Sequence, residues 1–79
     1  MKVEEFTPGL WRHYKGQEYL ALGIAREDET DEPVVVYVRL YQRDGLPMST
    51  RRLAIWSQQV ECEGNMVPRF AYVGQRSAG

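Results

Sequence analysis

The chain has 79 residues, of which 43% are hydrophobic and 27% are charged, and its formal net charge at pH 7 is −1. This length leaves room for a single hydrophobic core, and the composition excludes an intrinsically disordered chain. A net charge near zero excludes a general electrostatic attraction to nucleic acid or to a membrane surface, so such binding would need a local cluster of charges.

The first 25 residues predict two strands joined by a tight turn. Leu10–Tyr14 is short, aromatic and alternating, and Lys15-Gly16 follows it as a turn. The second strand is Glu18–Ala25, which is apolar on both faces. Gly23 within it marks a bulge or the close approach of another backbone.

Residues 34–42 read VVVYVRLYQ and give the clearest strand prediction in the chain. Alternation places one set of side chains on one face (Val34, Val36, Val38, Leu40) and a second set on the other (Val35, Tyr37, Arg39, Tyr41). Because the first face is uniformly aliphatic, we expect Val36 and Val38 to be core residues. A hairpin turn should follow at Asp44-Gly45, with Gly45 at positive φ, because Asp-Gly tolerates the backbone angles of such turns.

The remaining residues predict a short helical turn and two more strands. Residues 51–57 suit one helical turn, since Leu53 and Trp56 are spaced to face inward together. Residues 58–62 are a weak strand, and residues 69–73 form the last strand after Pro68.

Short strands separated by Gly or Pro turns are typical of small all-β domains. We therefore predict an all-β fold with room for one short helical turn, either an SH3-like barrel or a compact β-sandwich. The predicted domain spans residues 7–74, and residues 1–6 and 75–79 are expected to be flexible termini.

The cysteine content and the N-terminus favour a cytoplasmic protein. Cys62 is the single cysteine, which rules out an intrachain disulfide framework and a thiolate-rich zinc site. Small secreted domains usually need such links. No apolar run approaches the length of a membrane span, and Met1–Glu5 lacks the order of a signal peptide.

The segment PGLWRHYKG at residues 8–16 resembles the opening signature of a bacterial family described as domain of unknown function 1653. Further matches follow in order: Tyr19, Gly23-Ile24-Ala25, Glu29-Thr30, Val35-Val36-Tyr37, Leu40-Tyr41 and Pro68-Arg69-Phe70. The resemblance runs from about Pro8 to Val73. It implies no established activity, cofactor or substrate.

Two segments depart from the pattern of that family. The family commonly has His-Ser-Glu-Thr where this chain has Glu27-Asp28-Glu29-Thr30, so any role of that histidine is absent here. A Trp-Val-Arg-Pro-like stretch is usual where this chain has Ser49-Thr50-Arg51-Arg52. Arg51 is then the residue at the basic position.

His13 is the only histidine and the first candidate for chemistry. It could be a general base or a hydrogen-bonding group in a pocket, or its ring could fix the Lys15-Gly16 turn by donating to a backbone carbonyl. His13 and Cys62 stand in no local signature of a Cys-His hydrolase. The acidic run Glu27–Glu32 lacks the spacing of a calcium loop, so we expect a solvated loop there, no metal site and no catalytic residues.

The alternating residues Tyr37, Arg39 and Tyr41 suggest a ligand-binding stripe, because tyrosine rings stack on planar groups and arginine pairs with anions. The alternative is that the tyrosines form a second core layer and Arg39 extends to solvent. Likewise, Arg51 and Arg69 could belong to a positive patch or could protect an exposed strand edge.

These features favour a non-enzymatic binding module for RNA or a nucleotide-like ligand, with no cofactor. The predicted ligand-binding residues are Trp11, His13, Tyr37, Arg39, Tyr41, Arg51 and Arg69. The alternative is a protein–protein adaptor or small homodimer in which the same aromatic residues are interface anchors. An enzyme of an unrecognised type is the third possibility.

Overall fold

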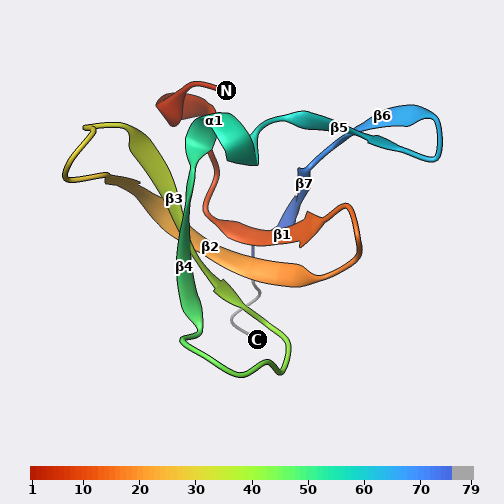
Figure 1. Ribbon diagram of the computed structural model, residues 1–79, viewed down its shortest axis with the longest axis horizontal. Helices are drawn as coiled ribbons and strands as arrows, with labels where there is room; N and C mark the ends of the chain where they lie inside the picture. Colours follow the sequence, from red (N-terminus) through yellow and green to blue (C-terminus); the bar gives the residue numbers. More distant parts are fainter. Residues whose placement is uncertain (76–79) are drawn as a thin grey trace.

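The computed structural model describes residues 1–75, in which seven strands form two antiparallel sheets (Figure 1). The larger sheet has the order β4-β3-β2-β1-β7, and the smaller one is the β5–β6 hairpin. The strands are β1 Gly9–His13, β2 Glu18–Arg26, β3 Pro33–Arg39, β4 Met48–Arg52, β5 Gln59–Cys62, β6 Asn65–Pro68 and β7 Phe70–Gly74. A 3-10 helix, η1 (Val3–Glu5), precedes β1, and a four-residue helix, α1 (Leu53–Trp56), follows β4.

The core lies on one face of the larger sheet, here called the inner face, and it is built mainly from aromatic rings. Trp56 of α1 is fully buried and stacks on Phe70 of β7 with ring centroids 3.8 Å apart. The rings of Trp11 and Tyr37 form T-shaped pairs with the Trp56 ring, with centroids 5.5 and 5.0 Å away. The whole cluster comprises Phe6, Trp11, Ala21, Val35, Tyr37, Leu53, Trp56 and Phe70. Large rings let this short chain fill a core with few side chains.

The larger sheet curves around this core. In a flat sheet, four strand spacings of about 4.8 Å would hold the β4 and β7 edges about 19 Å apart. Instead, the guanidinium carbon of Arg51 in β4 lies 5.5 Å from the centre of the Phe70 ring in β7. The two edges therefore approach each other, although β4 and β7 are not paired and the barrel is not closed.

The prediction of an all-β domain with one short helical turn is confirmed, and so is the bulge near Gly23. The pairing of β2 with β3 shifts register between Ala21 and Gly23, which leaves Leu22 as the extra residue. Gly45 has φ of +100°, as predicted, although the connection between β3 and β4 is a longer loop.

The expected core face of β3 was wrong. Val36 and Val38 are only half-buried, whereas Val35 and Tyr37 are 0% and 7% exposed and belong to the core cluster. The reason is that the aromatic rings of β1, β7 and α1 gather against the Tyr37 side of the strand. The aliphatic side of β3 is the outer face of the sheet.

The packed part of the chain begins earlier than expected. The sequence predicts a flexible terminus at Phe6, but this residue is 9% exposed and its ring stacks on Trp11 at 5.4 Å. The other expected flexible segment, 75–79, lies outside the described residues except for Gln75. No helix within residues 1–75 is long and apolar enough to span a membrane.

Candidate functional site

His13 stands at the end of β1 and is held in place by its own turn. Its Nδ1 accepts a hydrogen bond from the Lys15 backbone N–H at 3.2 Å, and its ring meets the Phe70 ring at 5.0 Å. The ring thus fixes the Lys15-Gly16 turn, but as an acceptor and not as the predicted donor. With Nδ1 accepting, the neutral ring carries its proton on Nε2, which makes Nε2 a donor.

Three cations lie near this histidine: Arg51 meets the same Phe70 ring as His13, Arg69 directly precedes Phe70, and Lys15 is two residues from His13. Burial, followed by the charges of Arg51, Arg69 and Lys15, lowers the pKa of His13 from 6.5. The imidazole is therefore neutral at pH 7. We call His13, Lys15, Arg51 and Arg69 the rim cluster, since they gather where the curved edges of the larger sheet approach each other.

The two arginines of the rim cluster have unused hydrogen-bonding capacity. The Nη2 of Arg69 donates to Oε1 of Gln58 at 3.2 Å, but its buried Nε has no partner among residues 1–75. Arg51 lies over the Phe70 ring. Within the described chain neither side chain makes an ion pair. A guanidinium has five N–H donors, so this site holds positive charge and donors without an acidic acceptor.

Other arginines are already paired with carboxylates. Ion pairs join Arg12 to Glu18, Arg26 to Asp28 and Asp31, and Arg52 to Glu32. Arg52 is the neighbour of Arg51 on β4, yet the two side chains leave the strand on opposite faces. On β4 the register thus separates the paired Arg52 from the unpaired Arg51.

Two tyrosines continue the inner face beside the rim cluster. The hydroxyls of Tyr19 and Tyr41 are 2.8 Å apart, and the Tyr19 ring meets Phe70 at 5.8 Å. Burial and the hydrogen bond with Tyr41 raise the pKa of Tyr19 to about 12. The same bond lowers the pKa of Tyr41, and either hydroxyl can be the donor of the pair.

Arg39 is bound to its own loop. Nη1 donates to the Leu46 carbonyl at 2.6 Å, and Nη2 donates to the carbonyls of Arg43 and Gly45 at 2.6 and 2.7 Å. The guanidinium organises the loop between β3 and β4 instead of facing a ligand. The structure therefore does not present Tyr37, Arg39 and Tyr41 as one open stripe, because Tyr37 is buried and Arg39 is bound by its loop.

Trp11 and Tyr37 are likewise core residues. Trp11 is 5% exposed, and its Nε1 donates to the Thr7 carbonyl at 2.9 Å. Tyr37 is buried against Trp56. Neither ring presents a face to a ligand. Of the seven predicted ligand-binding residues, the structure brings together His13, Arg51 and Arg69, with Tyr41 close by through Tyr19.

Lys15 and Tyr19 were not among the predicted ligand-binding residues. Lys15 directly follows the His13-Tyr14 pair in a turn, and its Nζ lies 5.9 Å from the centre of the Tyr14 ring. Tyr19 stands opposite Trp11 across the β1–β2 pair. That register could have indicated an inner-face position, because Tyr19 must share the face of Trp11.

An open cavity of about 400 Å³ adjoins His13 and lies against the β5–β6 hairpin, which extends to one side of the molecule (Figure 1). Its lining residues include Arg12, His13, Tyr14, Cys62, Val67 and Tyr72. No hydrogen bond joins His13 to Cys62 among residues 1–75, although both line this cavity. Cavities of this volume hold small organic ligands.

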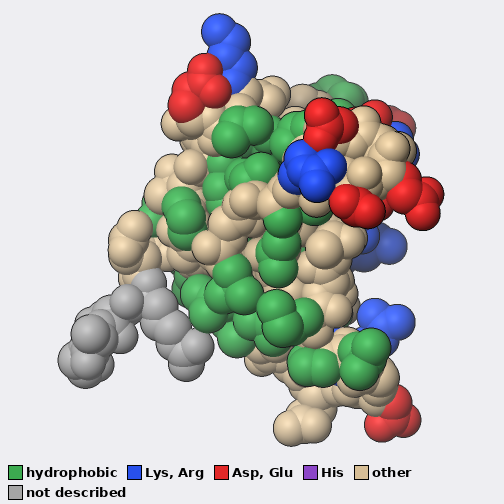
Figure 2. Space-filling view, turned by 90° about the vertical axis from the view of Figure 1, so that its left-hand side faces the viewer, with side chains coloured by type: hydrophobic (Ala, Val, Ile, Leu, Met, Phe, Trp, Pro, Cys, Tyr) green, Lys and Arg blue, Asp and Glu red, His purple; other side chains and the backbone are tan. Residues whose placement is uncertain are grey.

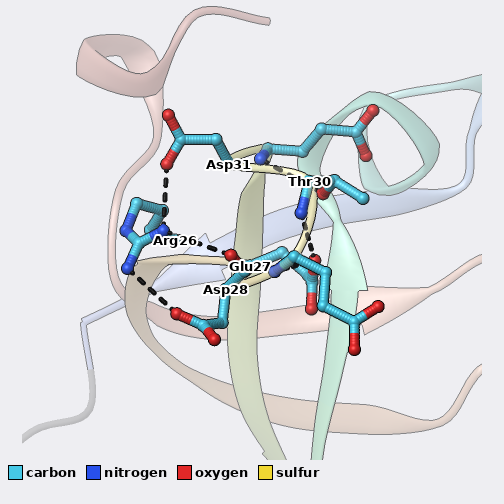
Figure 3. Close-up of polar contacts among 7 residues, drawn as sticks. Arg26, Glu27, Asp28, Thr30 and Asp31 are labelled. Atoms are coloured by element: carbon cyan, nitrogen blue, oxygen red, sulfur yellow. Dashed lines mark hydrogen bonds and ion pairs between the residues drawn. The ribbon is translucent and has the colours of Figure 1, made fainter.

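The acidic loop between β2 and β3 uses its carboxylates internally (Figure 3). Arg26 bridges Asp28 and Asp31 at 3.2 and 3.0 Å. The Glu27 carboxylate accepts the backbone N–H groups of Thr30 and Glu29, and the Thr30 bond contributes most to lowering the pKa of Glu27. No group of three metal-binding side chains occurs in the described part of the chain.

Comparison with known proteins extends the resemblance noted from the sequence. The family described as protein of unknown function (DUF1653) matches residues 9–72. A crystal structure of a DUF1653 protein from Bordetella bronchiseptica is 59% identical in sequence, with a TM-score of 0.92 over 99% of this chain and 100% of that one. No curated protein matches. The chain belongs to the DUF1653 family.

Proposed function

We propose that this domain is a non-enzymatic binding module that holds a nucleotide phosphate, free or within RNA, at the rim cluster. The observation that carries the proposal is the gathering of Arg51, Arg69 and Lys15 around a neutral His13 without an acidic partner in residues 1–75. Bringing cations together without a counter-charge is unfavourable, so an anion bound between them would relieve the repulsion.

The donors of the cluster suit a phosphate. Arginine presents a planar fork of N–H groups that matches the oxygens of a phosphate, and lysine adds a point charge. The Nε2–H of His13 adds a neutral donor. A bound phosphate would also raise the pKa of His13, because an anion favours the imidazolium.

The surroundings favour a nucleotide over a bare phosphate. The cavity beside His13 has room for a base or sugar, and Tyr14 is a half-buried ring on its wall. Base–tyrosine stacking is tolerant of sequence and contributes about 1–3 kcal/mol per base. An enzyme of the Cys-His type is less well supported, because His13 is tied to the Lys15 N–H and makes no hydrogen bond to Cys62 in the described residues.

The single histidine gives a direct assay. Its imidazole resonance can be followed by NMR against pH with AMP, inorganic phosphate, adenosine or a five-nucleotide single-stranded RNA present. We expect AMP to raise the pKa of His13 and to bind more tightly than phosphate or adenosine alone. Tighter binding of the RNA than of AMP would identify the RNA as the ligand class; equal or weaker binding would identify the free nucleotide.

Arg51 and Arg52 provide a matched pair of variants. Arg51→Gln should weaken AMP binding about tenfold or more, since a hydrogen bond to a charged group contributes about 1.5–3 kcal/mol. Arg52→Gln, on the opposite face of the same strand, should change the affinity less than twofold. No binding by the wild-type protein at low salt, or equal losses in both variants, would refute the proposal.

A further inference from the structure

The rim cluster holds more hydrogen-bond donors than its own chain uses. The guanidinium of Arg51 lies over an aromatic ring and donates no hydrogen bond within residues 1–75. The guanidinium of Arg69 donates one hydrogen bond and leaves its buried Nε without a partner in that part of the chain. Lys15 and the Nε2–H of His13 add further donors. A ligand that satisfies this site therefore needs several acceptor oxygens on one group.

The positive charge of the cluster is not balanced as it is elsewhere on the surface. Figure 2 shows a face on which the Lys and Arg side chains at the top and upper right lie beside Asp and Glu side chains. Arg26 is an example, since it lies 3.2 Å from Asp28 and 3.0 Å from Asp31. The three cations of the rim cluster have no such partner in residues 1–75. A ligand with more than one negative charge is therefore favoured.

The three cations also converge on one point and do not form a row. Lys15 belongs to the turn after β1, Arg51 belongs to β4, and Arg69 joins β6 to β7. The charges of all three act on His13. Arg51 and His13 also lie against the same Phe70 ring. A site that binds the backbone of a nucleic acid has instead a positive groove that follows successive phosphates. The arrangement in this domain fits a single phosphate group.

The backbone that carries these side chains is held in place by the fold itself. The Arg69 N–H donates to the Gln58 carbonyl at 2.8 Å, and the Arg69 carbonyl accepts the Tyr14 N–H at 3.0 Å. In the turn after β1, the Gly16 N–H donates to the His13 carbonyl at 2.7 Å. Preorganised donors lose less freedom on binding, so their number and charge decide which ligand is favoured.

Phosphate monoesters and diesters differ in the two properties that this site selects. A monoester carries about 1.5–2 negative charges at pH 7 and presents three acceptor oxygens. An internal phosphodiester carries one negative charge and presents two such oxygens, because its other two are esterified. We infer that the rim cluster prefers the terminal phosphate monoester of a nucleotide or of an RNA end to an internal phosphodiester, an inference that rests on the function proposed above.

The test compares AMP with its methyl ester, adenosine 5′-(methyl phosphate), by calorimetric titration of the wild-type chain. The two ligands share the base and the sugar, and the added methyl group removes one charge and one free oxygen. AMP should bind at least tenfold more tightly, because the ester loses a hydrogen bond to a charged group. By the same reasoning, a five-nucleotide RNA with a 5′-phosphate should bind at least tenfold more tightly than the same RNA with a 5′-hydroxyl.

Variants of the chain show whether the cluster is the source of this selectivity. Arg51→Gln and Lys15→Gln should each lower the ratio of the affinities for AMP and its methyl ester at least threefold, since each removes donors for the third oxygen. Arg52→Gln, on the opposite face of β4, is the control and should leave the ratio unchanged. Circular dichroism melts establish that each variant is folded.

A ratio of ten or more in wild type, lowered in both cluster variants and not in Arg52→Gln, supports the inference. Equal binding of AMP and its methyl ester would overturn it and leave the proposed phosphate site unaffected. Binding of neither ligand would overturn the inference and the proposed function together. An unchanged ratio in either cluster variant would also overturn it, because the selectivity would then arise elsewhere.

Discussion

Replacing Arg39 by Ala should destabilise the domain, because three carbonyl groups of one loop share its guanidinium. The bonds to Leu46, Arg43 and Gly45 are 2.6–2.7 Å long. A hydrogen bond to a charged group contributes about 1.5–3 kcal/mol where water is excluded. These carbonyls are exposed and would regain water, so we use about 0.5–1 kcal/mol for each bond. The expected loss is about 2 kcal/mol, which lowers the melting temperature of a domain of this size by about 8–16 °C.

Thermal unfolding followed by circular dichroism measures this loss. Arg12→Ala is the control, since it removes one exposed ion pair and should cost only about 0.5 kcal/mol. Arg39→Lys keeps the charge but lacks the planar fork, so it should lose more than half of the stabilisation. An Arg39→Ala protein that melts within about 2 °C of wild type would refute the structural role and reopen the sequence-based hypothesis of a ligand contact.

Three further predictions concern the core, a glycine and pH. Val35→Ala should lose about 2 kcal/mol in urea unfolding and Val36→Ala less than half as much, because only Val35 is fully buried in the core. Gly9→Ala should destabilise more than Gly16→Ala in the same assay: both have positive φ, but a Cβ on Gly9 would lie 2.8 Å from the Gly74 carbonyl oxygen, whereas Gly16 has open space. The pKa of His13 in the folded chain lies below 6.5, so the unfolded chain binds more protons near that pH. The free energy of unfolding of wild type, compared with that of His13→Gln, should therefore fall as pH drops below about 6.5.

The number and position of most strands follow from alternation, but the direction in which β3 faces does not. Both sides of β3 are apolar, so the pattern cannot distinguish inside from outside. The choice is made by Trp56 and Phe70, which meet Tyr37 from distant parts of the chain. The strand β4 had no signal either. Its sequence, MSTRR, is polar because an edge strand with an exposed outer side needs few apolar residues.

The candidate site could be predicted only in part, because residue type can be read from the sequence but strand register cannot. His13, Arg51 and Arg69 could be selected by residue type, since histidine and arginine are the groups that bind anions. Which arginines remain free depends on register, which sets Arg12 opposite Glu18. The curvature that brings Arg51 over Phe70 is also a property of the whole sheet. Sequence patterns show neither the register nor the curvature of the sheet. They therefore select Arg39 by residue type alone, although its guanidinium is bound by its own loop.

The arginine of the rim cluster on β4 faces the inner side of the larger sheet, and this arrangement yields a last prediction. Arg51 extends over Phe70 on the inner side, whereas Met48 of the same strand is paired with Val38 on the outer side. A substitution at Met48 should therefore leave the rim cluster intact. Met48→Glu should leave the affinity for AMP within twofold of wild type, although Arg51→Gln weakens it about tenfold or more. Calorimetric titration of each variant with AMP measures both affinities, and circular dichroism melts establish that both variants are folded. Loss of AMP binding in a folded Met48→Glu protein would mean that the phosphate site is not confined to the inner side, and the placement argued from the sheet geometry would be wrong.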